Sequence, residues 1–356
     1  MIATPSLRPR SQALRAASLG LAFLLAAAPA ARATFSIVAV DKNTGEVGCA
    51  GASCINGVAR IGDTVEGIGA INTQALYVAL NQDNARARLL AGDSPEMVVD
   101  WLRANDFNGQ PELRQYGVVD LSYGGRAAAH TGTLNGDWKG HKVGPDYSIQ
   151  GNILIGEWVL QRMEDAFLAS DGLPLSDRLM AALDAASFPA ADRRCAAISS
   201  LSAFIRVTRI GDGATPYLNL TSSSRTSDPI DVLKGRYDAW RAAEASRVDP
   251  LKTNVSVRPP VRLADGRSFG YLIVVPRNRD GVRLGTGFAI AATHTGGGTL
   301  GEFTERQPGV YGAPITSPTE AGLDSFFVTV DDGSGSPPIE IARGATCRYV
   351  APSTAR

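Results

Sequence analysis

The stretch TFSIVAVDKNTGEVGCAGAS, residues 34–53, decides the fold. Phe35 to Val40 is a nearly continuous apolar run, residues 41–45 are turn formers, and residues 46–53 resume as a second strand. This pattern predicts a β-hairpin. Because the first strand does not alternate with polar residues, we expect it to be covered on both faces, as in a layered α/β sandwich.

Helix and strand patterns continue from this hairpin as far as Arg247. The apolar spacing predicts helices over 75–90, 95–102, 152–169, 175–186 and 228–247. Strands are expected over 69–73, 116–121, 126–130 and 202–209, and the glycine-rich segment 131–144 is expected to be a loop. The length of 356 residues suggests two domains, of which this mixed region is the first, over 34–248.

The pattern changes after Asn254. Short apolar runs separated by Gly, Pro and Asp turns fill the rest of the chain, and none of them has helical spacing. About a hundred residues of this kind predict an all-β sandwich over 255–356.

The first 33 residues are expected to be a secretory signal peptide. Arg8, Arg10 and Arg15 precede the apolar run 19–28, which is too short to be a permanent membrane span. Cleavage after Ala33 would release Thr34, whereas cleavage after Ala30 would leave three residues ahead of it. We therefore expect a secreted or periplasmic protein that spans no membrane.

Charge and composition exclude several classes of function. Lys and Arg, 35 residues, balance Asp and Glu, 35 residues, and 44% of the chain is hydrophobic, which excludes a disordered chain and a basic nucleic-acid binder. Three scattered histidines and the lack of a CxxC pair predict no metal site, and the common hydrolase and nucleotide motifs are missing. No cofactor is expected.

Four cysteines in an exported chain predict one or two disulfides. Three pairings are open, but Cys49 and Cys54 would point to opposite faces of one strand, so a bridge between them is disfavoured. Pairing of Cys54 with Cys195 is favoured because both lie in the first proposed domain. Asp192, Arg193 and Arg194 are expected to form an ion pair or to anchor a loop beside Cys195.

Thr34 is the candidate catalytic residue. If cleavage exposes it, one residue carries a hydroxyl nucleophile and an α-amine with a pKa of about 7.7 to 8.0, which suits a general base. The competing interpretation is that a threonine happens to follow a signal peptide. Cleavage after Ala30 would abolish the role of the amine.

Supporting residues are predicted at places where a strand is expected to become a helix. Asn152 is the candidate donor to an oxyanion, with capping of its helix as the equal alternative. Asn72 and Gln74 are candidates for lining a substrate pocket, although capping is the more ordinary role. His141 is a candidate for binding substrate, and its alternative is a structural histidine.

Several sequence blocks resemble a known family. These are residues 34–48, GIGAINTQAL from Gly67, RQYGVVD from Arg114, GHKVGPDYSIQGNIL from Gly140 and ADRRC from Ala191. Together they resemble the bacterial domain-of-unknown-function family 1028 as far as about Arg247. The resemblance implies an N-terminal nucleophile (Ntn) hydrolase fold, an α+β fold of four αββα layers, with no settled substrate.

A second resemblance covers residues 255–350. GGTLGEFTERQPGVYGAPITSP from Gly297 and GLDSFFVTVDDG from Gly322 resemble bacterial immunoglobulin-like repeats of the invasin and filamin type. Such modules are usually spacers or adhesive units rather than catalysts.

The sequence therefore predicts an exported hydrolase of an amide or related acyl bond. A small molecule, a peptide or a component of the cell envelope is its expected substrate. Whether the protein forms a homo-oligomer is left open by the sequence. The alternative is a catalytically inactive Ntn-fold protein that serves as a binding scaffold at the envelope. A third hypothesis places the function in the C-terminal module, as a binder of a surface glycan or protein.

Overall fold

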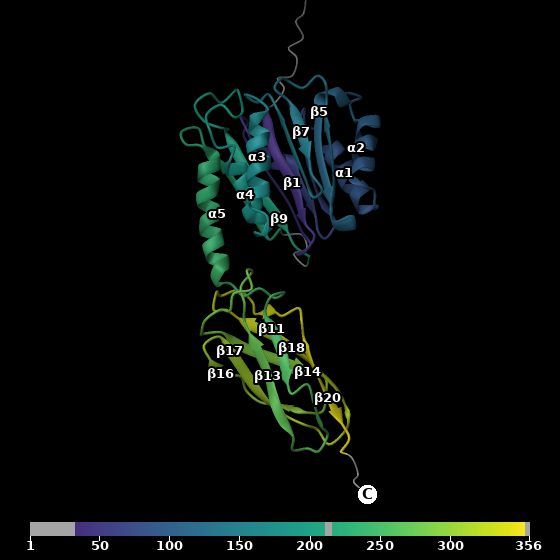
Figure 1. The fold of residues 1–356 in the computed structure, drawn as a ribbon, viewed down its shortest axis with the longest axis vertical. Helices are drawn as coiled ribbons and strands as arrows, with labels where there is room; N and C mark the ends of the chain where they lie inside the picture. Colours follow the sequence, from purple (N-terminus) through teal and green to yellow (C-terminus); the bar gives the residue numbers. More distant parts are fainter. Residues whose placement is uncertain (1–32, 211–215, 353–356) are drawn as a thin grey trace, which may run out of the picture.

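The computed structural model describes residues 33–210 and 216–352 (Figure 1). The proposed signal peptide, apart from Ala33, lies outside these residues. The chain has a mixed α+β fold, in which antiparallel sheets and five α-helices precede a β-rich C-terminal region within the described ranges. No helix in these ranges combines the length and apolarity that a membrane crossing requires.

The first sheet has six antiparallel strands with β1 (Thr34–Asp41) near its centre. Its order is β10 (Leu218–Ser223), β9 (Ser202–Thr208), β2 (Glu46–Ser53), β1, β8 (Tyr147–Asn152) and β7 (Gly140–Val143). The predicted hairpin is confirmed, because β1 pairs with β2 from Thr34 opposite Ser53 to Asp41 opposite Glu46.

The second sheet has four antiparallel strands. Its order is β3 (Gly62–Val65), β4 (Gly69–Ala75), β5 (Arg114–Asp120) and β6 (Arg126–Thr131). Helices α1 (Ala79–Leu90) and α2 (Pro95–Ala104) follow β4, and short 3-10 turns occur at η1 (Val58–Ile61), η2 (Pro111–Leu113) and η3 (Ser122–Gly124). Ser94 caps α2 by accepting a hydrogen bond from the backbone of Met97, and Pro95 opens the helix, as predicted.

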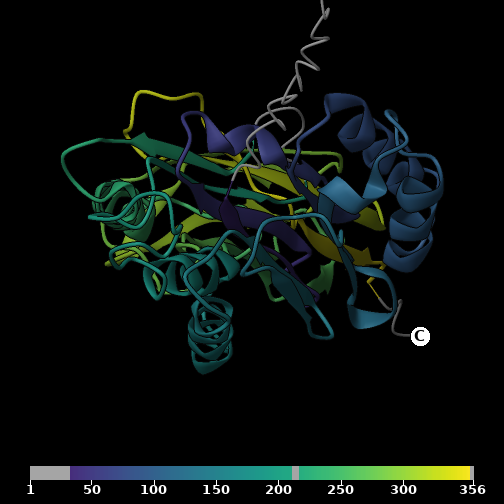
Figure 2. The ribbon, with the colours of Figure 1, turned by 90° about the horizontal axis from the view of Figure 1, so that it is seen from above.

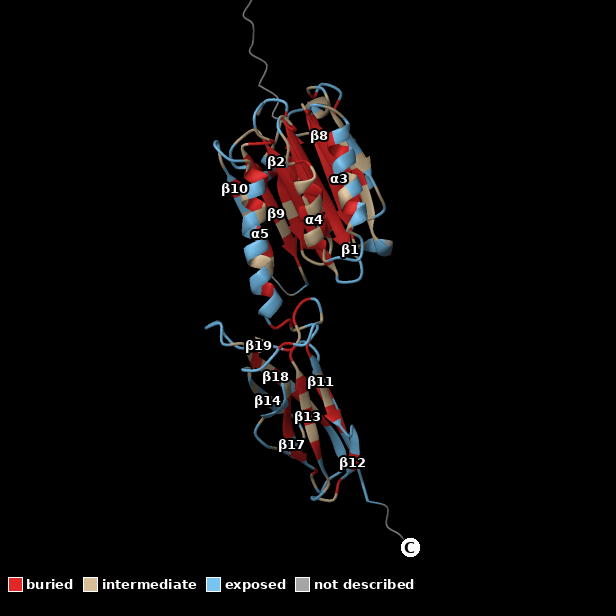
Figure 3. Ribbon diagram, turned by 60° about the vertical axis from the view of Figure 1, so that its left-hand side comes forward, coloured by how far each residue is buried: buried red, intermediate tan, exposed pale blue. Residues whose placement is uncertain are grey.

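Both faces of β1 are covered, which explains its nearly continuous apolar run. Phe35 and Ile37 point into a core shared with α3 (Trp158–Ala169), α4 (Leu175–Asp184) and α5 (Pro229–Ser246). Val38 and Val40 point the other way, into a core shared with the second sheet. Figure 2 shows α1 and α2 on one side of the two sheets and α3 to α5 on the other, and Figure 3 shows the buried strands between them.

Three predicted elements are wrong in their extent. The helix predicted over 75–90 begins at Ala79, because 72–75 continue β4, and the helix predicted over 152–169 begins at Trp158, because 147–152 form β8. The predicted loop 131–144 contains β7. Strands β4 and β8 are fully buried yet rich in Asn, Gln and Ser, so their sequences lack the apolar run by which a buried strand is recognised.

The C-terminal region consists of two sheets that face each other. One has the order β11 (Asn254–Arg258), β13 (Phe269–Val275), β17 (Val310–Thr316) and β15 (Thr299–Leu300), with β16 (Thr304–Gln307) also on β17. The other has the order β12 (Val261–Leu263), β20 (Ala345–Val350), β18 (Gly322–Asp331) and β14 (Ala289–His294), with β19 (Ile339–Glu340) on β18. Leu272 and Val274 from one sheet share a core with Phe326 and Val328 from the other.

A loop of the C-terminal region docks on the first domain. The guanidinium of Arg279 lies 2.7 Å from both carboxylate oxygens of Glu46 and donates to Ser176 at 2.9 Å. Next to it, Asp280 accepts two hydrogen bonds from Arg241 of α5 at 2.9 Å. Glu46 and Arg279 are both buried, so the two regions share a buried ion pair.

Candidate functional site

The start of β1 meets the ends of its two neighbours. In the strand register Thr34 lies opposite Ser53, the last residue of β2, and opposite Asn152, the last residue of β8. Strand pairing therefore brings three polar side chains together at one end of the first sheet. Thr34 and Asn152 were predicted as site residues, and Ser53 was not. Thr34 is 2% exposed in the chain that still carries Ala33.

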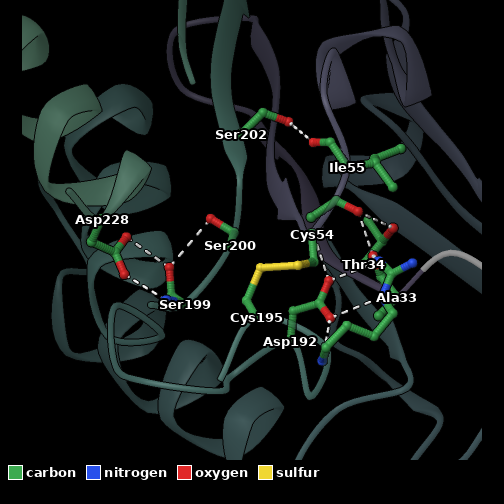
Figure 4. Close-up of a disulfide and its surroundings, with 12 residues drawn as sticks. Ala33, Thr34, Cys54, Ile55, Asp192, Cys195, Ser199, Ser200, Ser202 and Asp228 are labelled. Atoms are coloured by element: carbon green, nitrogen blue, oxygen red, sulfur yellow. Dashed lines mark hydrogen bonds and ion pairs between the residues drawn. A yellow bond between two sulfur atoms is a disulfide. The ribbon is translucent and has the colours of Figure 1, made fainter. Parts of the chain in front are cut away.

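The carbonyl group that precedes Thr34 is held by two donors (Figure 4). Arg194 Nη2 donates to the Ala33 carbonyl oxygen at 2.8 Å, and Ser53 Oγ donates to the same oxygen. Thr34 Oγ1 in turn donates to Ser53 Oγ at 3.1 Å. The Ala33 carbonyl and the Thr34 hydroxyl thus share Ser53 Oγ as a hydrogen-bond partner.

Asp192 fixes the position of Arg194. Its carboxylate accepts hydrogen bonds from Arg194 Nε at 3.2 Å and Nη2 at 3.0 Å, and from the backbone N–H of Cys54 at 2.5 Å. Asp192 is fully buried, and these donors, together with the backbone N–H of Arg194 at 3.1 Å, compensate its negative charge. The expected ion pair beside Cys195 is confirmed.

A disulfide joins the two segments that carry these donors. Cys54 and Cys195 form the predicted bridge, with Cα atoms 5.7 Å apart, and it links the end of β2 to the loop of Asp192 and Arg194. Cys49 and Cys347 are free and buried, and burial raises the pKa of the Cys49 thiol to about 12. The Cys49 thiol is therefore not a nucleophile at neutral pH.

Removal of this disulfide is expected to destabilise the protein by about 2–4 kcal/mol, since the bridge closes a long loop. The double variant Cys54→Ser/Cys195→Ser should show this loss in chemical denaturation. Cys347→Ser, at a free buried cysteine of the other domain, is the matched control. Equal stability of the double variant and the wild type would contradict the expectation.

A buried network of amides lies beneath the site. Gln74 accepts a hydrogen bond from Ser36 Oγ at 2.6 Å and donates to Gln115 Oε1 at 2.7 Å. Gln150 donates to Ser36 Oγ at 2.6 Å, and Gln115 donates to the Gly151 carbonyl at 2.8 Å. The network is uncharged and connects β1 and β8 of the first sheet to β4 and β5 of the second, so it holds the strand ends at Thr34 in register.

Gly117 is the position that leaves room for this network. A Cβ atom added there would lie 2.0 Å from Gln150 Oε1 and 2.6 Å from its Cδ. Gly117→Ala is therefore expected to displace Gln150 and to cost about 1–3 kcal/mol of stability. Thermal unfolding measures this cost, with Gly235→Ala as control, because a Cβ at Gly235 meets nothing within 4 Å. An unchanged melting temperature for Gly117→Ala would contradict the role.

The predicted site residues Asn152 and Gln74 lie beside Thr34. Asn152 ends a strand and caps no helix, and its Nδ2 donates to Gln115 Oε1 at 2.9 Å. Its Oδ1 is buried without a hydrogen-bond partner among the described residues. Gln74 also approaches the Thr34 carbonyl at 3.5 Å. The oxyanion role of Asn152 stays a prediction.

The other two predicted residues lie further from Thr34. Asn72 is buried in β4, where its Nδ2 donates to the Ile37 carbonyl at 3.1 Å and so joins the two sheets. His141 lies on the edge strand β7, and its Nδ1 is 2.8 Å from Thr131 Oγ1. Desolvation and the neighbouring His130 lower the pKa of His141, which favours its neutral form. Their roles in substrate binding stay predictions.

Sequence reasoning did not select Ser53, Arg194, Gln115 or Gln150 as functional residues. Arg194 stands next to Cys195 and Ser53 next to Cys54, so the favoured disulfide was the available signal for both. Within residues 33–210 and 216–352, no group of three or more His, Cys, Asp or Glu side chains is arranged to hold a metal ion.

The family model described as "Family of unknown function (DUF1028)" matches residues 34–233, more than half of the chain. The chain belongs to this family. A solved member, protein SPO2555 from Silicibacter pomeroyi, is 29% identical over 58% of this chain and 88% of its own, with a TM-score of 0.49. Comparison with curated proteins gives no match.

Two bacterial adhesins also show similarity to this DUF1028 protein. Adhesin InvE of Yersinia pseudotuberculosis is 25% identical over 30% of this chain and 28% of its own, with a TM-score of 0.26. FdeC, an Escherichia coli adhesin, is 10% identical over 67% of this chain and 59% of its own, with a TM-score of 0.26.

Proposed function

We propose that this DUF1028 protein is an exported hydrolase of an amide or related acyl bond, with Thr34 as its N-terminal nucleophile once residues 1–33 are removed. The observation that carries the proposal is the Ala33 carbonyl, which accepts hydrogen bonds from Arg194 and Ser53 beside the Thr34 hydroxyl. These two donors mark where the carbonyl oxygen of a substrate would lie.

The chemistry follows from these groups. The neutral α-amine of Thr34 takes the proton of Oγ1 as that oxygen attacks the carbonyl carbon of the substrate. Arg194 and Ser53 stabilise the negative charge that develops on the carbonyl oxygen. The leaving amine takes the proton as the C–N bond breaks, and water then hydrolyses the ester on Thr34 by the same route in reverse.

Thr34 is buried in the chain that retains Ala33. Ala33 is itself fully buried, and its carbonyl occupies both donors. Cleavage between Ala33 and Thr34 would vacate this space and create the α-amine in one step. The proposal therefore requires that the mature protein, in contrast to the full chain, admits a carbonyl group at this position.

Other features support the same proposal. The first domain has three cores, and each lies between two successive layers in the order helices, sheet, sheet, helices. This order fits the αββα layering of Ntn hydrolases. The disulfide between Cys54 and Cys195 fits an oxidising compartment outside the cytoplasm. The β-sandwich would then be an immunoglobulin-like module that holds the enzyme near its substrate.

The enclosure of Thr34 favours one alternative, an inactive Ntn-fold scaffold that binds a partner at the cell envelope. The experiment is an amidase and acylase substrate screen on the mature protein. If Arg194 stabilises an oxyanion, Arg194→Gln should lower kcat by about 100-fold or more on any substrate found. Arg193→Gln, next to it in the chain, is the control. Equal kcat for Arg194→Gln and the wild type would remove Arg194 from the mechanism.

A further inference from the structure

A cleft of about 890 Å³ lies where the first domain meets the β-sandwich, away from the site at Thr34. The β1–β2 turn, the α3–α4 loop and the start of α4 line it on one side, and residues 249–252, Arg279, Asp280 and Arg343 line it on the other. Asp41, at the far end of β1 from Thr34, lines this cleft, so about 23 Å of strand separates the two sites.

Most charged groups of the cleft are already paired with one another. Glu46 pairs with Arg279 at 2.7 Å, Arg241 bridges Asp177 and Asp280, and Arg209 pairs with Asp249 at 2.9 Å. These pairs build the junction between the two domains. They leave little hydrogen-bonding capacity for another molecule.

Arg178 differs from these paired groups. It is 7% exposed, its Nε has no hydrogen-bond partner within residues 33–210 and 216–352, and its Cζ lies 4.0 Å from the centre of the Phe167 ring. Two carboxylates approach its Nη atoms, those of Asp146 and Asp171, and each stands 3.8 Å away. This separation exceeds a hydrogen bond, so neither of these carboxylates, the two nearest among the described residues, is hydrogen-bonded to the buried guanidinium that lines the cleft.

The surroundings of Arg178 define which ligand would satisfy it. A planar carboxylate matches the fork of a guanidinium, whereas Asp146 and Asp171 nearby disfavour a doubly charged phosphate. The Asp171 side chain is 83% exposed, and its Oδ1 lies 3.8 Å from Arg178 Nη2, so it can accept hydrogen bonds from an ammonium group beside that carboxylate. At the mouth, the exposed cations Lys252 and Arg343 attract a carboxylate.

We propose that this cleft binds a free α-amino acid, with its carboxylate on Arg178 and its ammonium group on Asp171. The two charged groups of an α-amino acid are a few ångströms apart, as Arg178 and Asp171 are. The inference does not rest on Thr34 or on hydrolysis.

The test is isothermal titration of the full chain with the L- and D-forms of the standard amino acids, and with acetate and inorganic phosphate. At least one amino acid should bind with a Kd below about 1 mM and more tightly than acetate or phosphate. Arg178→Gln should weaken that binding roughly tenfold or more, and Asp171→Asn should weaken it without weakening acetate binding.

Variants at exposed positions serve as controls, because they should change the charge without unfolding the protein. Arg343→Glu, at the mouth of the cleft, should weaken binding without unfolding the protein, and Arg348→Glu, exposed on the sandwich outside the cleft, should not change it. Binding of none of the amino acids, or an unchanged Kd in Asp171→Asn and Arg343→Glu, overturns the proposal. Phosphate binding as tight as that of the amino acids identifies a general anion site and also overturns it.

Discussion

Thr34→Ala is expected to abolish turnover of any amide or acyl substrate of the mature protein. The variant keeps the α-amine but has no hydroxyl to accept the acyl group, so the covalent step is lost rather than slowed. Loss of the nucleophile in a serine protease lowers kcat by about a million-fold, and a loss of that order would place residual activity below detection in most assays. The measurement is kcat on the substrate found by screening.

Thr34→Ser is the matched control for this prediction. It keeps a hydroxyl on the same β-carbon and is expected to retain part of the activity. The Thr34 hydroxyl donates to Ser53 Oγ at 3.1 Å, and Thr34→Ser retains a hydroxyl that can make this hydrogen bond. Turnover by Thr34→Ala at the wild-type rate would remove Thr34 from the chemistry.

Arg114→Met is expected to cost about 3–5 kcal/mol of stability. Arg114 Nε and Nη2 donate to Asp106 at 2.7 and 3.0 Å, and both side chains are almost fully buried. Methionine would fill the space of the arginine but leave the Asp106 carboxylate buried without its counter-charge. Chemical denaturation measures the loss, with Arg103→Met as control, because its ion pair with Asp100 is exposed and worth about 1 kcal/mol or less.

The same pair predicts a pH dependence. Burial raises the pKa of Asp106, but hydrogen bonds from Arg114, the Gln110 backbone and Asn81 outweigh burial and hold it below its ordinary 3.8. Because the folded-state pKa is lowered, this stabilisation is present above pH 3.8 and is lost as the pH falls through the folded-state value. Arg114→Met should lose less stability than the wild type in that acid range. A parallel loss in both proteins would contradict the assignment.

The parts of the fold that the sequence predicted share strong local signals. The hairpin of 34–53 combines an apolar run with a turn, and Ser94 with Pro95 marks the start of α2. Strands β4 and β8 were missed in part because their buried side chains are Asn72, Gln74, Gln150 and Asn152. Those amides are stable inside the protein only through contacts between the two sheets, which no local pattern contains.

The candidate site shows the same division. Thr34 could be selected because a cleavage motif precedes it and a strand begins at it. Arg194 is far from Thr34 in the sequence and reaches the Ala33 carbonyl only because the disulfide and Asp192 position its loop. Arg178 lies in the cleft between the first domain and the β-sandwich, and nothing in the sequence distinguishes it from other helical arginines. That its Nε has no hydrogen-bond partner in the described part of the chain becomes evident only from the structure.

Mass spectrometry of the exported protein tests the central claim most directly. The protein is exposed to an electrophilic amide analogue, and its N-terminal peptide is then sequenced. We predict a chain that begins at Thr34 and carries one acyl adduct on the Thr34 hydroxyl, with no adduct in Thr34→Ala. A chain that begins at Ala31 would contradict the account. A chain that begins at Thr34 but carries no adduct on it would also contradict the account.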